Sequence, residues 1–246
     1  MGLTVHYKLA APAETTESQA TQLVESMRLL AGRSFYMKGL VDDVGSITTD
    51  RKIVRRFGVG WLRLPIPGRP NVSNHVEVHP TTGFLFHVEV GKDCEPLWLG
   101  LCKYPKTVLF QWKDVRTKKL GGWQLAGFSK TQFASNYGWE HFVRCHCAVV
   151  ELLAACRTLG LRVRISDEGE YWPGRSIAKL RENIGQMNGV VAAAAGALRD
   201  IDEAAKGKSD VQSPIFAHRN FERLEAEGAM KIGPMLKKLR AAAGKS

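Results

Sequence analysis

The sequence contains no long apolar run and few cysteines. No window approaches the roughly 18 uninterrupted apolar residues of a transmembrane helix, so we expect no membrane span. The first residues do not combine a basic segment with an apolar run, so they are not typical of a secretory signal. The cysteines number five in 246 residues, and an odd set in a chain of this length argues against a disulfide scaffold and for reduced thiols. These absences together predict a cytoplasmic protein.

Acidic residues are scarce relative to basic ones. Lys and Arg number 35 against 24 Asp and Glu, which gives a formal net charge of +11. A chain this basic attracts polyanions, so nucleic acid or another polyanion is the expected partner. The sequence contains no ribonucleoprotein aromatic signature, no zinc-finger spacing and no clear helix-turn-helix. A basic surface that only confers solubility is the alternative interpretation.

Short runs with period-two alternation predict strands. Leu3 to Leu9 alternates apolar and polar side chains, as a half-buried strand does. Further strand candidates are 60–64, 97–102, 108–112, 123–128 and 161–165, and the runs 76–78 and 84–90 look like a hairpin. The spacing leaves no room for crossover segments, so the pairing is expected to be antiparallel. The sequence thus predicts an antiparallel or mostly antiparallel sheet of five or more strands.

About three helices are expected to flank this sheet. Apolar side chains recur at helical spacing near 17–31, 138–159 and 174–199. Glycines in the last of these lower its helix propensity but permit close approach of a neighbouring backbone. Residues 33–73, with Gly and Pro clusters, are expected to form a long irregular connection around one strand. The expected fold class is therefore α+β.

Composition changes at about Asp200. Residues 202–214 are polar and predict a linker. A short helix is expected over 216–227, followed by a tail with Lys231, Lys237, Lys238, Arg240 and Lys245. The predicted organisation is one α+β domain over residues 1–200, then a linker and basic helical tail over 201–246.

Basic residues gather in two segments that are candidates for nucleic-acid binding. The eight residues that we expect to contact phosphates are Arg51, Lys52, Arg55, Arg56, Lys113, Arg116, Lys118 and Lys119. Tryptophans at positions 61, 98, 112 and 123 are interleaved with them, which suits phosphate pairing alongside base stacking. The alternative is that the tryptophans belong to the core and the basic residues form a solvated face.

A second dense set of reactive side chains lies at the ends of two predicted strands. Asp167, Glu168 and Glu170 follow the strand over 161–165, and Lys130 follows the strand over 123–128. If these strands are neighbours, a cation and several carboxylates face each other across one cleft beside a helix N-terminus.

These four residues are therefore catalytic candidates for a metal-assisted hydrolase or another phosphate-processing enzyme. A salt-bridged structural corner is an equally supported interpretation. A third hypothesis is a component of a larger assembly with no chemistry of its own. The sequence assigns no cofactor.

Cysteines and histidines on the helix near 138–159 suggest a metal site at first sight. Cys145 and Cys147 are about 200° apart on a helix, so their thiols diverge. His141 and Cys145, four residues apart, supply only two ligands, too few for a structural zinc site. We expect no metal here. His146 lies in the middle of the apolar face and is expected to be a buried, hydrogen-bonded core histidine.

Three segments carry a resemblance to other proteins. They are Gly-Leu-Thr-Val-His-Tyr at 2–7, Lys-Thr-Gln-Phe-Ala-Ser at 130–135 and Asp-Glu-Gly-Glu-Tyr-Trp at 167–172. Together they resemble a group of bacterial hypothetical proteins of about this size, over residues 1 to about 200. That group has no established activity, cofactor or fold, so the resemblance implies no site residue. It implies a bacterial, cytoplasmic origin.

Limited proteolysis tests the predicted boundary. Because the segment after Asp200 is polar and has no wide apolar stripe, the first cut is expected between Asp200 and Pro214 and should leave a stable core. Mass spectrometry of the earliest fragments locates that cut. A first cut within residues 138–199 would show that the boundary is wrong.

Overall fold

A six-stranded antiparallel sheet forms the centre of the molecule. In the computed structural model, which describes the backbone of residues 3–243 and the side chains of residues 3–233, its order is β10-β1-β9-β6-β5-β2. These strands are β1 (Thr4–Ala10), β2 (Asp43–Val44), β5 (Thr82–Glu89), β6 (Leu97–Lys103), β9 (Trp123–Lys130) and β10 (Arg162–Asp167). Every pairing in this sheet is antiparallel. The predicted α+β fold with an antiparallel sheet is confirmed.

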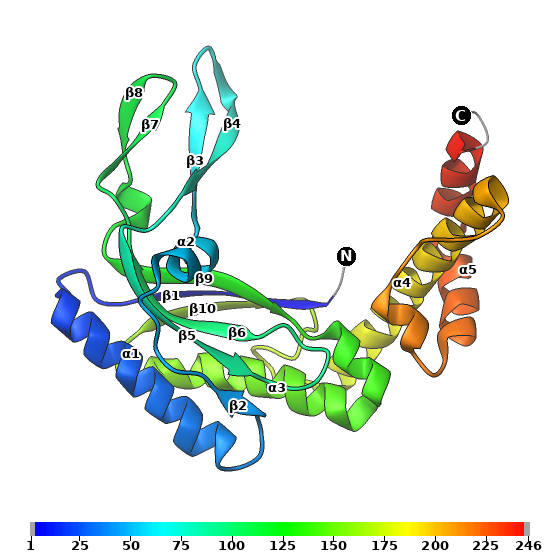
Figure 1. Ribbon diagram of the computed structural model, residues 1–246, viewed down its shortest axis with the longest axis horizontal. Coiled ribbons are helices and arrows are strands. Elements are labelled where there is room, and N and C mark those ends of the chain that lie inside the picture. Colours follow the sequence, from blue (N-terminus) through cyan, green and yellow to red (C-terminus); the bar gives the residue numbers. More distant parts are fainter. Residues whose placement is uncertain (1–2, 244–246) are drawn as a thin grey trace.

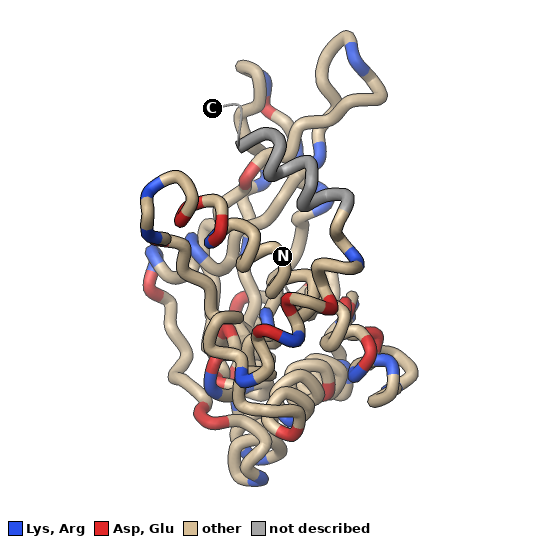
Figure 2. The backbone as a smooth tube through the Cα atoms, turned by 90° about the vertical axis from the view of Figure 1, so that its right-hand side faces the viewer, with Lys and Arg blue, Asp and Glu red and all other residues tan. Residues whose placement is uncertain are grey.

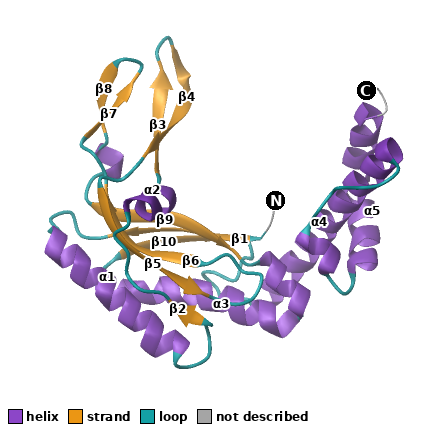
Figure 3. Cartoon of the chain, in the orientation of Figure 1, coloured by secondary structure: helices purple, strands orange, loops and turns teal. Residues whose placement is uncertain are grey.

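Two helices cover one face of the sheet. α1 (Glu17–Ala31) and α3 (Trp139–Ala155) lie side by side beneath it (Figures 1 and 3). Both match helices expected from the sequence, and α1 begins with a capping box between Thr16 and Gln19. Alternation along β1 buries Val5 and Leu9 completely. The main core therefore lies between the sheet and these two helices.

The other face of the sheet is only partly covered. α2 (Arg51–Phe57) lies over the β5 side. Two hairpins project on the same side, β3 (Gly60–Ile66) with β4 (Arg69–Val78) and β7 (Thr107–Phe110) with β8 (Lys113–Arg116) (Figure 1). The exposed side chains of His6, Arg164 and Phe128 mark the uncovered part, over β10, β1 and β9.

Three segments differ from the sequence expectation. The hairpin expected from 76–78 and 84–90 is wrong, because β4 pairs with β3 whereas β5 pairs with β6. The strand expected over 108–112 ends at Phe110, and the chain reverses through Gln111 and Trp112, both with positive φ. The connection over 33–73 contains α2, a short helix that buries only Val54 and therefore lacks a visible apolar stripe.

The two C-terminal helices pack against each other and project from the end of the sheet, and the chain between them returns alongside α4 so that both helices run toward the same side (Figure 1). α4 (Ile177–Lys206) and α5 (Phe221–Ala243) cross where a Cβ placed on Gly228 would lie 1.8 Å from the carbonyl oxygen of Gly189. This contact confirms the close backbone approach expected at Gly189. Only glycine fits at Gly228, so the crossing depends on the absence of side chains.

The C-terminal boundaries differ in detail from the expected ones. The first residues of the expected linker, 202–206, are the last turn of α4, and the helix expected over 216–227 begins at Phe221. The side chains of Lys237, Lys238 and Arg240, and Lys245 altogether, lie outside the described part of the chain. Among the described helices, none has a stretch long and apolar enough to cross a membrane.

A buried polar network joins α4 to the sheet. Gln132, in the short helix η3 (Gln132–Tyr137), accepts a hydrogen bond from the backbone N–H of Leu3 at 3.0 Å. Its amide nitrogen donates to Oδ1 of Asn188 at 3.0 Å, and Nδ2 of Asn188 donates to Oγ of Ser135 at 2.9 Å. Gln132, Ser135 and Asn188 are all buried. Because buried polar groups are costly when unpaired, this network fixes where α4 leaves the sheet.

Replacing Asn188 tests this joint. Asn188→Ala removes the partner of the amide nitrogen of Gln132 and of the hydroxyl of Ser135, so the free energy of unfolding should fall by about 1–3 kcal/mol. Gln186→Ala on the exposed side of the same helix removes only a surface contact with Glu182 and should change it by less than about 0.5 kcal/mol. Urea denaturation measures both; equal effects would contradict the role of the network.

Candidate functional site

A pocket of about 490 Å³ opens on the uncovered face, where β1, β10 and η2 (Lys118–Leu120) meet. Its cationic lining residues are Lys8, Lys118, Lys119, Arg162 and Arg164. No lining residue is acidic. Among residues with described side chains, none of the five forms an ion pair with a carboxylate. We call these five residues the basic pocket.

Strand register brings residues from distant parts of the sequence into this pocket. Lys8 on β1 lies directly opposite Arg164 on β10, and Ala10 lies opposite Arg162. Because side chains alternate between the two faces of a strand, Arg162 and Arg164 share the uncovered face while Val163 points to the core. Three cations therefore gather on two adjacent strands.

Burial and the neighbouring positive charges both act on the pKa of Lys8. Partial burial lowers the pKa of Lys8 below its usual value, and the neighbouring charges of Arg164 and Arg162 lower it further. Because no carboxylate offsets these cations, a bound anion would relieve both their repulsion and the cost of burying the ammonium group. The arrangement suits an anionic ligand.

A second pocket, of about 750 Å³, adjoins the first on the same face. Its aromatic and imidazole lining residues are His6, Tyr7, Phe57, Trp61, Trp98 and Phe128. Phe57 and Trp98 are stacked, with ring centroids 4.0 Å apart and an interplanar angle of 15°. Trp61 and Phe128 remain 55% and 54% exposed, although both are large apolar residues. We call this the aromatic pocket.

Diverging strands create the floor of the aromatic pocket. β6 and β9 pair at Cys102–Gln124 and Lys103–Trp123, at one end of each strand. Toward Trp98 and Phe128 no pairing of these strands is present among the described residues. The hydroxyl of Tyr7 bridges the gap by donating to the carbonyl oxygen of Trp98. A Cβ on Gly127 would lie 2.5 Å from that hydroxyl, so glycine is needed for the bridge.

All eight basic residues expected to bind nucleic acid have exposed side chains. Lys118 and Lys119 line the basic pocket, and Arg56 lines the aromatic pocket with its guanidinium over the Phe57 ring. The others lie on α2 and on β8, in elements that stand on the open side of the sheet (Figure 1). By contrast, basic and acidic positions are interspersed on the α4–α5 side (Figure 2).

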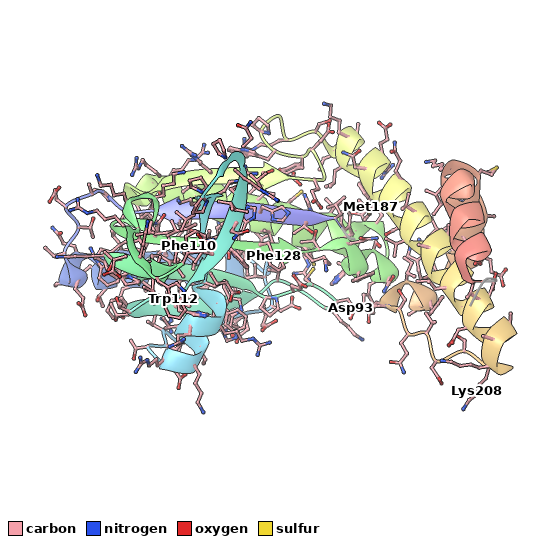
Figure 4. All side chains as sticks on the ribbon, turned by 90° about the horizontal axis from the view of Figure 1, so that it is seen from above. Asp93, Phe110, Trp112, Phe128, Met187 and Lys208 are labelled. Carbon is pink, nitrogen blue, oxygen red and sulfur yellow. The ribbon has the colours of Figure 1, made fainter. Side chains whose placement is uncertain are left out.

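Sequence reasoning missed Lys8, Arg162 and Arg164. The available signal was the Arg-Val-Arg-Ile alternation over 162–165, which places both arginines on the polar face of one strand. The tryptophans divide between the two interpretations: Trp123 is buried in the core, Trp61 is half exposed, and Trp112 is 92% exposed at the tip of the β7–β8 hairpin (Figure 4).

The structure does not bring Lys130 together with the three carboxylates proposed as its catalytic partners. β1 lies between β9 and β10, so the two strands are not neighbours. Lys130 instead contacts Glu95, with its Nζ 3.8 Å from Oε1 and its backbone N–H donating to Oε2 at 3.1 Å.

Glu168 and Glu170 also have separate partners. Glu168 accepts a hydrogen bond from the backbone N–H of Thr4 at 2.9 Å and lies 3.5 Å from Nε2 of His6. Glu170 pairs with Lys179 at 3.2 Å. Their carboxylates are therefore dispersed over different contacts, and the geometry favours a structural corner over a catalytic cluster.

Asp167 is the buried member of this group. Its carboxylate accepts backbone hydrogen bonds from Gly169 at 2.7 Å and Trp172 at 2.9 Å, and its Oδ1 lies 3.0 Å from Nε2 of His146. The other imidazole nitrogen of His146 lies 2.8 Å from the hydroxyl of Thr131. Both ionisable side chains are fully buried, which confirms the expected burial of His146.

Opposing effects act on the carboxyl group of Asp167. Burial raises the pKa of Asp167, but the hydrogen bond and charge of His146, together with the two backbone N–H groups, outweigh it, so the pKa lies below its usual value. The folded state thus holds the ionised form, which ties the turn after β10 to α3.

The thiols of Cys145 and Cys147 contact different elements. Sγ of Cys145 lies 3.7 Å from the carbonyl oxygen of Val90 and 3.7 Å from Nε2 of His141, whereas Cys147 interacts with Tyr171. Over the part of the chain that the structure describes, no group of three or more His, Cys, Asp or Glu could hold a metal ion.

Comparisons with family models, curated proteins and solved structures find no match. The function is therefore inferred from the chemistry of the site. The basic pocket and the aromatic pocket adjoin on the open face of the sheet, whereas Asp167 and His146 lie 3.0 Å apart in the core.

Stability measurements on two neighbouring carboxylates distinguish these roles. Asp167→Asn should lower the free energy of unfolding by about 3 kcal/mol, because it removes a buried charge from its partners. Glu168→Gln should lower it by less than about 1 kcal/mol, because Glu168 is 43% exposed. Urea denaturation at neutral pH provides both values, and a similar loss in both variants would contradict the assignment of Asp167 as the buried corner.

The stability difference between wild type and Asp167→Asn is also expected to depend on pH. Because the pKa of Asp167 is lowered on folding, its stabilising contribution is present above the unfolded pKa of about 3.9 and is lost as the pH falls through the folded value. The stability difference between wild type and Asp167→Asn should therefore be constant near neutral pH and shrink below about pH 4. A difference that grows in acid would reverse the assigned direction.

Proposed function

We propose that the protein binds nucleic acid through the open face of its sheet. The observation that carries this proposal is the basic pocket, in which Lys8, Arg162 and Arg164 gather beside Lys118 and Lys119 without an acidic neighbour. Guanidinium groups present paired N–H donors that match phosphate oxygens, and ammonium groups add point charges. Five such groups around one recess form a site for consecutive phosphates.

The elements around the pocket extend the same chemistry. α2 carries Arg51, Lys52, Arg55 and Arg56, and β8 carries Lys113 and Arg116, all exposed. These elements stand on the side of the sheet that the basic pocket faces. A polyanion lying along this face would meet cations over more than one pocket, so the binding is expected to be electrostatic in its main part.

The enzymatic hypothesis receives no comparable support. Lys130, Glu168 and Glu170 are each held by a different partner, and Asp167 is enclosed with His146. A role as a component of an assembly that contains nucleic acid is compatible with the proposal, because it requires the same surface.

Removing charge from the basic pocket tests the proposed function. Arg162→Gln combined with Arg164→Gln should weaken binding to a fluorescently labelled oligonucleotide, because two phosphate contacts are lost. The slope of log affinity against log salt should become shallower by up to about 1.4, which is twice the 0.7 expected for each contact to a single strand. Fluorescence anisotropy over a salt series measures both quantities.

A charge-matched variant serves as the control. Lys208→Gln combined with Lys231→Gln removes two exposed charges on the α4–α5 side, and Lys208 lies at one end of the molecule, away from Phe128 (Figure 4). This variant should bind like wild type. The proposal fails if wild type binds no oligonucleotide at low salt, or if both double variants weaken binding equally.

A further inference from the structure

We infer that the nucleic acid is single-stranded, with an unpaired base in the aromatic pocket while the adjoining phosphates occupy the basic pocket. This inference rests on the proposed function and goes beyond it by naming the class of ligand. Single-stranded RNA and single-stranded DNA share this chemistry.

The two pockets are close enough to bind one short segment of a nucleic-acid strand. His6 lines the aromatic pocket and Lys8 lines the basic pocket. These residues are two positions apart on β1 and point to the same face, about 7 Å from each other along the strand. β9 also runs through both pockets, with Gln124 in the first and Ala126 in the second. One face of two paired strands thus offers a cationic half and an aromatic half.

The exposed rings have the chemistry of a stacking platform. Trp61 and Phe128 expose more than half of their surface at the pocket, while the stacked rings of Phe57 and Trp98 form part of its lining. A large apolar surface left open beside a cationic one indicates a ligand with both apolar faces and negative charge. Nucleobases attached to a phosphate backbone have this combination, and stacking tolerates any base because every base has a π-face.

Charge also favours one orientation of the bound nucleic acid. Glu95 is the acidic residue among those that line the aromatic pocket. Its carboxylate already contacts Lys130, but each carboxylate oxygen has a further lone pair that can accept a hydrogen bond from an exocyclic amino group. The basic pocket contains no such acid. The base is therefore placed toward Glu95 and the phosphates toward Arg164.

A duplex does not fit this arrangement. Its bases are stacked and paired, so no base face is free to contact Phe128 or Trp61. The aromatic pocket is lined by residues of α2 and β3 as well as of the sheet, so a single base enters it more readily than a helix. Duplex binding would use only the cations and lose the stacking contribution.

Binding to matched oligonucleotides tests the inference. The probes are a labelled single strand as RNA and as DNA, its duplex, and a strand of equal length with abasic sites, which keeps the phosphates but removes the bases. Wild type should bind both single strands more tightly than the duplex and the abasic strand. Phe128→Leu keeps an apolar side chain but removes the ring, so it should weaken single-strand binding about 5- to 150-fold and leave abasic-strand binding unchanged. Phe128→Tyr should restore tight binding.

Two further variants complete the design. Trp61→Leu should behave like Phe128→Leu, and because both side chains are over half exposed, thermal melts are expected to show folded protein. Tyr36→Ala removes a ring that is 50% exposed in the segment after α1 and should bind like wild type.

The outcomes separate this inference from the proposed function. Equal affinity for the single strand, the abasic strand and the duplex, with salt dependence and the effect of the arginine variant intact, overturns the single-strand inference and leaves nucleic-acid binding standing. Unchanged single-strand binding in both Phe128→Leu and Trp61→Leu would also overturn the single-strand inference and leave nucleic-acid binding standing. Absence of binding to every probe at low salt overturns both.

Discussion

The position of β1 between β9 and β10 determines which side chains of this protein act together. Its register sets Lys8 opposite Arg164, which assembles the basic pocket from distant parts of the sequence. The same strand separates Lys130 on β9 from the acidic turn after β10. Hydrogen bonding of one central strand therefore both creates the cationic cluster and prevents the cation–carboxylate cleft that the sequence suggested.

The buried polar side chains of Thr131, His146 and Asp167 serve mainly to hold the fold together. Thr131, His146 and Asp167 form a buried chain of contacts between the end of β9, α3 and the turn after β10. Gln132, next to Thr131, connects β1 to Asn188 on α4. Thr131 and Gln132, which are adjacent in sequence, thus take part in two different contacts between elements. Because these polar groups contact one another away from water, they specify how the elements meet without being open to a ligand.

Local patterns predicted what depends on local sequence. The helices over α1, α3 and α4, the antiparallel sheet and the burial of His146 all follow from periodicity that a single segment displays. The β3–β4 hairpin was missed because β4 is a largely exposed strand without alternating burial, and its partner cannot be identified from its own residues. The pairing of β4 is therefore determined by tertiary contacts and not by its local sequence.

The candidate site also combines features that local sequence predicts with features that depend on tertiary contacts. Exposure of the eight basic residues could be expected from their charge, but the gathering of Lys8 with Arg164 depends on strand pairing across more than 150 residues of sequence. The burial of Asp167 depends on His146, which lies on a different element. A carboxylate in a polar turn has the same local sequence whether it faces solvent or core, so its role becomes visible only in the fold.

β10 is an edge strand of the sheet, and this has a consequence for contacts between copies of the protein. An edge strand presents unpaired N–H and C=O groups that can pair with the edge of another molecule, and charged side chains oppose such pairing. Arg162 and Arg164 place two like charges along this edge. A second copy approaching edge to edge in antiparallel fashion would bring its own arginines against them. The arginines that we propose to contact phosphate thus also oppose the extension of this sheet by a second one.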